Sequence, residues 1–177
     1  MKTKNESLRF SWRIIYSHVI AYFIAGLFAY NFIHYKELYA TKELSLLMRP
    51  VTTPIVALGP VLQLIRGMIL ALVLLPFRKV IVEEKHGYLK LALLIVGLSV
   101  ISTIGPAPGS FDGYIYTIIP AGYQMLGYIE AALYVFLFVS ILAGSYKLEK
   151  AWVNTVAIVL LILITLAGIA GYVSLRN

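Results

Sequence analysis

The sequence contains no cysteine and few charged residues. The absence of cysteine among its 177 residues excludes disulfides, thiol catalysis and thiolate metal sites. Only 13% of the residues are charged and 60% are apolar, whereas a soluble domain is about 25% charged and about 45–50% apolar. The mean hydropathy is +0.87. This composition indicates that lipid, rather than water, surrounds much of the chain.

Acidic residues are scarcer than basic ones, and the net charge is +7. A basic surplus can indicate nucleic-acid binding, but here the Lys and Arg residues cluster at the ends of apolar runs. That distribution is typical of the loops of a multi-pass membrane protein. We therefore expect no nucleic-acid partner and expect membrane lipid as the surroundings.

The sequence also lacks the common motifs of catalysis and cofactor binding. It has no Walker motif, no dinucleotide fingerprint and no H-E-x-x-H. The three histidines, His18, His34 and His86, are expected at different depths and sides, so they do not form one metal site. Ser110 has no basic residue nearby to activate it as a nucleophile. We expect no metal and no cofactor, and a non-enzyme is favoured although an enzyme stays open.

Five apolar segments are long enough to be membrane spans, because about 20 helical residues cross a bilayer core about 30 Å thick. They are continuously apolar and do not alternate with period two, which favours helices over a barrel. The segments are about 14–33, 54–77, 88–104, 118–142 and 152–173. The prediction is an all-α polytopic membrane protein: one five-helix bundle, a single domain over 1–177, with residues 1–13 retained as a tail.

The loop charges predict the orientation. With five crossings, one side carries Lys2, Lys4, Arg9, Arg13, Arg78, Lys79, Lys85, Lys90, Lys147 and Lys150, and the other carries Lys36, Lys42, Arg49 and Arg176. Cytoplasmic loops are the ones enriched in Lys and Arg. We therefore expect a protein of the cytoplasmic (plasma or inner) membrane, with its N-terminus in the cytoplasm and its C-terminus outside.

Two outer connections have unusual composition. Residues 34–50 mix leucines with charges, which suits either a short helix lying on the membrane surface or an ordinary solvated turn. Residues 105–117, "GPAPGSFDGYIYT", contain two prolines and three glycines, which should forbid a regular helix. We interpret this stretch as a cap over the outer mouth of the bundle, with a plain turn as the alternative.

Arg66 and Glu130 are charges near the middle of the second and fourth apolar segments. A lone charge at the bilayer centre costs about 2.5–3.5 kcal/mol on insertion scales. Both segments run in the same direction, so the two residues reach similar depths. We therefore predict that Arg66 and Glu130 either form an ion pair or share a small polar cavity, with the helices meeting at that level.

Further polar side chains lie from this level outward, under the expected cap. The predicted ligand-binding residues are Arg66, Glu130, Gln63, Tyr123, Gln124, Ser99, Ser102 and Asp112. The guanidinium of Arg66 suits a carboxylate or phosphate, and the expected walls are apolar and aromatic. For Asp112, an ordinary turn-forming role is the alternative.

We therefore expect an integral membrane protein that binds or translocates a small amphipathic or anionic molecule in an outward-facing polar pocket, as a transport protein or a subunit of a larger membrane complex. Two alternatives stay open: a membrane-embedded enzyme with Glu130 as acid–base, and a structural subunit in which the Arg–Glu pair only fixes helix register. Small residues repeat every four positions at Ala21–Ala25–Ala29, Gly127–Ala131 and Ala167–Gly171. This spacing suits helix packing within the chain or in a homo- or hetero-oligomer, and both stay open.

Overall fold

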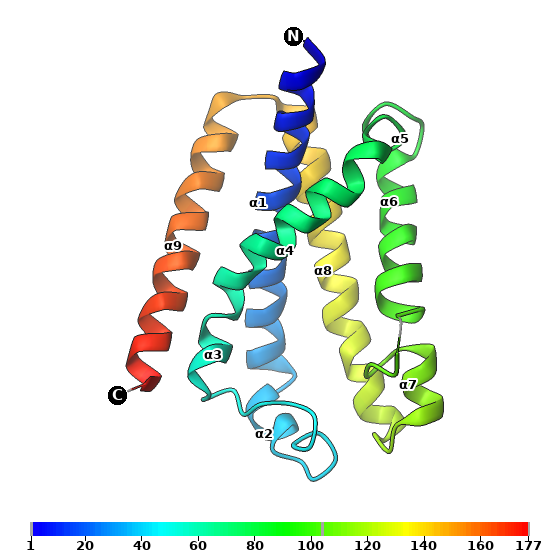
Figure 1. Cartoon of the computed structure of the whole chain (residues 1–177), viewed down its shortest axis with the longest axis vertical. Helices are drawn as coiled ribbons and strands as arrows, with labels where there is room; N and C mark the ends of the chain where they lie inside the picture. Colours follow the sequence, from blue (N-terminus) through cyan, green and yellow to red (C-terminus); the bar gives the residue numbers. More distant parts are fainter. Residues whose placement is uncertain (1, 104, 177) are drawn as a thin grey trace.

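The computed structural model describes residues 2–103 and 105–176, with side chains from residue 5 onward. Every regular element in this part of the chain is a helix, so the all-α class is confirmed. The two ends of the chain lie at opposite ends of the bundle (Figure 1). Residues 1 and 177, the limits of the predicted domain, and residue 104, the predicted end of the third segment, lie outside the described residues.

Four helices are long and apolar enough to cross a membrane, which indicates a membrane protein. They are Asn5–Phe32, Gly59–Val82, Ala121–Leu148 and Ala151–Arg176. The third predicted segment corresponds to a shorter apolar helix over Gly87–Ile101. A crossing by this helix, and with it the five-span bundle, stays a prediction.

Helix α1 (Lys2–Phe32) is the central helix of the bundle and packs most extensively against α4 and α8. Ala21, Ala25 and Ala29 are at most 1% exposed, so this small-residue repeat packs inside the chain. The helix begins well before residue 14, where the first span was predicted. The expected tail is therefore a helical extension of α1, and its exposed Arg9 forms an ion pair with Glu149 at 2.7 Å.

The second predicted segment is a series of helical pieces at an angle to α1 (Figure 1). The pieces are α3 (Pro54–Ala57), α4 (Gly59–Leu74), the 3₁₀ segment η1 (Leu75–Phe77) and α5 (Arg78–Val82). Pro60 stands in the first turn of α4, where a missing N–H costs little. Pro76 lacks the N–H that would continue α4 regularly, and the chain tightens to η1 there.

A short turn leads to α6 (Gly87–Ile95), which continues as the π-helical segment η2 (Val96–Ile101). A Cβ atom at Gly87 would clash with the carbonyl oxygens of Val80 and Ile81, so the turn requires glycine at this position. At about 1.5 Å per residue, α6 and η2 together extend roughly 22 Å, less than a bilayer core of about 30 Å.

Helices α8 (Ala121–Leu148) and α9 (Ala151–Arg176) are the last two of the long apolar helices. They are joined at Glu149, whose φ of 46° reverses the chain within two residues. The main core cluster joins α1, α4, α6 and α8 and includes Phe138 and Leu142, both fully buried. A second cluster packs α9 on α1 through Tyr16 and Leu161.

The two outer connections lie at the end of the bundle opposite the N-terminus (Figure 1). Residues 34–50 form the five-residue helix α2 (Tyr35–Tyr39) followed by turns. Residues 105–117 contain α7 (Phe111–Tyr116), so the prediction that no regular helix forms there is wrong. Both prolines precede α7, and the hydroxyl oxygen of Ser110 accepts a hydrogen bond from the Gly113 amide at 3.0 Å, which caps its first turn.

Candidate functional site

A cavity of about 430 Å³ lies between α4, η2, α8 and the two outer connections. Four of the eight predicted ligand-binding residues line it: Arg66, Ser99, Tyr123 and Glu130. Gly127 and Ala131 of α8 lie in its wall, so this small-residue pair leaves space instead of packing against a helix. The remaining lining is largely apolar or aromatic and includes Leu38, Leu44, Met48, Val100 and Tyr128.

Arg66 and Glu130 share this cavity without forming an ion pair. Among the ion pairs of the described residues, none joins these two side chains. The carboxylate of Glu130 instead accepts a hydrogen bond from the hydroxyl of Tyr35. Of the two predicted arrangements, the shared cavity is present and the direct ion pair is wrong, because the Glu130 carboxylate is bonded to Tyr35 of α2 instead.

Tyr35 and Tyr39 form the aromatic lid beside Glu130. Their rings stack with centroids 4.7 Å apart. Burial raises the pKa of Tyr35 well above its ordinary value, and the hydrogen bond to Glu130 raises it further. Burial also raises the pKa of Tyr39 to about 12, with the charge of Glu130 adding to the shift. Both hydroxyls therefore stay protonated at neutral pH and act as hydrogen-bond donors at the cavity.

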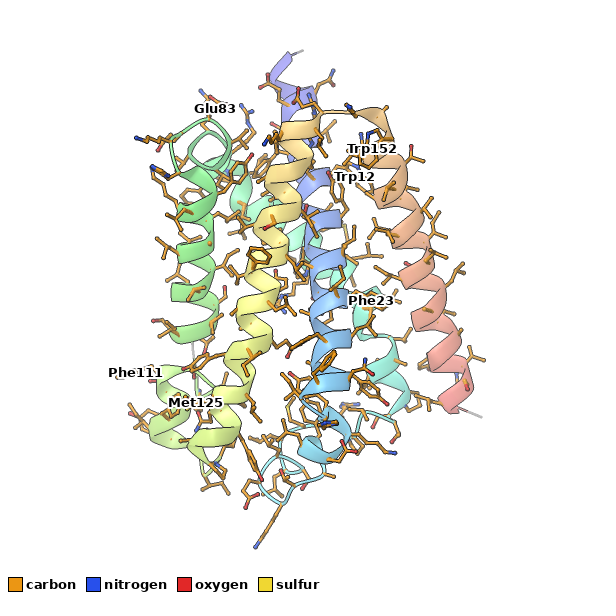
Figure 2. All side chains as sticks on the ribbon, turned by 180° about the vertical axis from the view of Figure 1, so that it is seen from behind. Trp12, Phe23, Glu83, Phe111, Met125 and Trp152 are labelled. Atoms are coloured by element: carbon orange, nitrogen blue, oxygen red, sulfur yellow. The ribbon has the colours of Figure 1, made fainter. Side chains whose placement is uncertain are left out.

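A second cavity, of about 500 Å³, lies on the other side of this lid. Tyr35, Tyr39 and Glu130 line both cavities. The other walls of the second cavity come from α1 and from the α3–α4 region, and they include Tyr22, Phe23, Leu27, Val56 and Pro60. Phe23 is labelled on α1 in Figure 2. The two cavities differ in their basic residues: Arg66 lines the first, whereas no Arg or Lys of the described residues lines the second.

His18 was not among the predicted ligand-binding residues, yet the structure places it where α1, α4 and α8 meet. It is fully buried. Its Nδ1 lies 2.7 Å from the hydroxyl of Tyr134 on α8, and its Nε2 lies 3.0 Å from Oε1 of Gln63 on α4. Gln63 therefore bonds to His18 and does not line the cavity. The amide oxygen of Gln63 is an acceptor, so Nε2 is the donor in that hydrogen bond.

The close approach of α1 and α4 explains why His18 and Gln63 meet. A Cβ atom at Gly67 would lie 3.3 Å from Cα of Ile15 and 3.4 Å from the His18 ring. Gly67 therefore brings α4 against α1 one turn after Gln63. No pattern in the sequence indicated this contact: Gln63 lies one turn from Arg66 and Tyr134 one turn from Glu130, yet both contact His18 of α1.

Gln124 is buried at 2% exposure and holds the 105–119 connection against α8. Its Oε1 accepts a hydrogen bond from the Gly109 amide at 3.2 Å. Its Nε2 donates to the carbonyl oxygens of Ile119 at 2.9 Å and Gly113 at 3.3 Å. The side-chain amide of Gln124 is thus hydrogen-bonded to the backbone of the connection. Residues 107–109 of this connection form one wall of the cavity.

Ser102 and Asp112 lie apart from the other predicted residues. Together with Ile101, Thr103 and Phe111 they line a small hollow of about 220 Å³ at the junction of η2 and α7. Among the described residues, no group of three His, Asp or Glu side chains is arranged to hold a metal ion.

The comparisons with known proteins give no further indication of function. No protein-family model, no curated protein and no solved structure matches this chain. The function of the chain is therefore inferred from the geometry of the site alone.

Proposed function

We propose that the chain is an integral membrane protein that binds or translocates a small amphipathic anion in the cavity lined by Arg66. One observation supports this most directly: within the described residues Arg66 has no acidic partner, and its side chain lines a largely apolar cavity. A guanidinium is always charged and presents paired donors to a carboxylate or phosphate. An anionic group with an apolar tail would complement both features.

The size and lining of the cavity support a small ligand. Its volume of about 430 Å³ falls in the range of about 300–1,000 Å³ that is usual for ligand sites. Ser99 and Tyr123 add polar groups to the cavity of Arg66, and the hydroxyl of Tyr39 adds a donor, whereas the hydroxyl of Tyr35 already donates to Glu130. The π-helical segment η2, which carries Ser99, supports the same proposal, because such segments occur often at functional sites.

Binding of octanoate, an amphipathic carboxylate, tests the proposal. We expect octanoate to raise the melting temperature of the purified protein in non-ionic detergent, and the uncharged octanol to raise it much less. Arg66→Gln should weaken octanoate binding by about tenfold or more, the effect of losing a charge-assisted hydrogen bond of about 1.5–3 kcal/mol. The matched control is Arg176→Gln, which removes the same charge outside the cavity. Equal octanoate binding by Arg66→Gln and the wild type would contradict the proposal.

A structural role is the second candidate, favoured by the bond from Tyr35 to Glu130. This contact fastens the surface helix α2 to α8, which a purely structural subunit would also need. In that case Glu130→Gln and Tyr35→Phe would lower the melting temperature, and no octanoate-dependent shift would be found in the wild type.

We further propose that α6 and η2 form a fifth crossing, with the N-terminus in the cytoplasm. Helices α4 and α8 both run from the α2 and α7 end toward the α5 end (Figure 1). The chain must therefore return between them, and α6 with η2 is the segment that does so. The basic residues of the α5–α6 turn support a cytoplasmic position for that turn.

The absence of cysteine allows a clean test of this topology. We expect Lys85→Cys to be protected from a membrane-impermeant maleimide in intact cells, and Lys42→Cys and Ser174→Cys to be labelled. All three should react after the membrane is opened, which controls for accessibility. Labelling of Lys85→Cys in intact cells together with protection of Lys42→Cys would reverse the orientation, and protection of Ser174→Cys with labelling of Lys42→Cys would exclude an odd number of crossings.

A further inference from the structure

A separate cavity of about 230 Å³ lies at the opposite end of the bundle, where α1, the end of α8 and the start of α9 meet. Three basic side chains line it: Arg9, Arg13 and Lys150. Tyr16, Ser145 and Asn154 add polar groups, and Glu149 is its one acidic residue. None of these residues takes part in the proposed ligand cavity.

Arg13 is the decisive residue of this basic cavity. Its side chain is only 4% exposed, and its Nη1 is buried with no hydrogen-bond partner. The guanidinium carbon lies 4.0 Å from the centre of the Tyr146 ring, so one face of the group is covered by an aromatic side chain. The hydroxyl of Tyr16, which also lines the cavity, is buried and unpartnered as well. Buried donors of this kind need an acceptor, above all when one is charged.

The other contacts leave the cavity positive. Arg9 is paired with Glu149, but both side chains are about half exposed, and such surface pairs contribute little. Helix α9 begins in the cavity wall and has no acidic residue in its first turn, so the positive end of its dipole is not compensated there. An anion could therefore take donors from Arg13 and Tyr16 and compete with Glu149 for Arg9.

We propose that this basic cavity binds a phosphate group. Arg13 follows the polar start of α1 and directly precedes its apolar run, which puts the cavity at the level of lipid headgroups in the proposed topology. The phosphate of an anionic lipid and free phosphate share the chemistry that these donors recognise. The inference does not depend on the octanoate site, because the two cavities have no residue in common.

The fluorescence of the two tryptophans of the chain can report binding at the basic cavity. Trp12 and Trp152 lie at this end of the molecule (Figure 2), and the Trp12 ring is 5.5 Å from that of Tyr16. We expect phosphatidylglycerol with brominated chains, added to the full-length protein in detergent, to quench tryptophan fluorescence at lower concentration than brominated phosphatidylcholine. In a second arm, inorganic phosphate is titrated without lipid against chloride at equal ionic strength.

Two lysine variants separate a specific site from general surface charge. Lys150→Gln should weaken the response about fivefold, the change expected for one basic residue near an anionic surface. Lys85→Gln removes an equal charge from the exposed α5–α6 turn and should leave the response unchanged. Arg13→Met should abolish the preference for phosphatidylglycerol. Should Arg13→Met fail to fold, the comparison of Lys150→Gln with Lys85→Gln still distinguishes a specific site from general surface charge.

Each outcome bears on the proposal. A response to the lipid alone assigns the cavity to a headgroup, a response to phosphate alone assigns it to a free anion, and a response to both shows that the phosphate group itself is recognised. Equal quenching by the two lipids with no response to phosphate would overturn the proposal. An equal effect of Lys150→Gln and Lys85→Gln would overturn it too.

Discussion

Replacing His18 by leucine is expected to lower the free energy of unfolding by about 2–3 kcal/mol, because Gln63 and Tyr134 each lose a hydrogen-bond partner in the interior. His18 is fully buried and joins α1 to both α4 and α8. Its loss should therefore loosen the contacts on both sides of the central helix. The measurement is unfolding of the purified variant in mixed micelles, followed by circular dichroism.

A second variant tests whether the unpaired polar groups cause the loss of stability in His18→Leu. Removing all three polar groups, with His18→Leu, Gln63→Leu and Tyr134→Phe together, should recover much of the lost stability, since no buried group is then left without a partner. If the triple variant is less stable than His18→Leu alone, the loss comes from packing at the Gly67 crossing and not from the hydrogen bonds.

Replacing Gln124 by methionine is expected to release the 105–119 connection and to lower the free energy of unfolding by about 3 kcal/mol, about 1 kcal/mol for each of three backbone groups left unpaired. These are the Gly109 amide and the Gly113 and Ile119 carbonyls. Methionine matches the length of glutamine, so the change is mainly one of hydrogen bonding. The freed segment should be cut faster by chymotrypsin at exposed aromatic residues such as Phe111 and Tyr116.

The matched control makes the same substitution elsewhere. Gln63→Met removes the bond to His18 and should lower stability, but it should not change the chymotrypsin rate in the 105–119 connection. Equal cleavage rates for Gln124→Met and the wild type would show that the connection is held by something other than this side chain.

The spans could be predicted from the sequence because lipid requires long apolar helices, and four of the five predicted segments correspond to the four long apolar helices. The residues at which the helices begin and end were less predictable. The first helix extends through the stretch before Ile14, where Phe10 is fully buried in the main core cluster. Likewise, the helix at Phe111–Tyr116 depends on a cap from Ser110 that the glycine and proline count conceals.

The shared cavity of Arg66 and Glu130 could be predicted because charges at similar depth on two spans tend to face one interior. The lack of a direct ion pair between them could not be predicted, because the hydroxyl that bonds to Glu130 belongs to Tyr35, in a segment with no apolar periodicity. The burial of His18 was equally hidden. It depends on the central position of α1, which contacts both neighbouring helices and which no pattern within the first segment indicates.

The hydrogen bond between Tyr35 and Glu130 lies where the two cavities meet. Because Tyr35, Tyr39 and Glu130 border both cavities, the hydrogen bond from the Tyr35 hydroxyl to the Glu130 carboxylate lies between a cavity that contains Arg66 and one lined mainly by apolar and aromatic side chains. A ligand whose own hydroxyl replaces that of Tyr35 at Glu130 would displace the lid of Tyr35 and Tyr39 between the two cavities. It would then occupy a continuous passage, with its polar head toward Arg66 and its tail along α1.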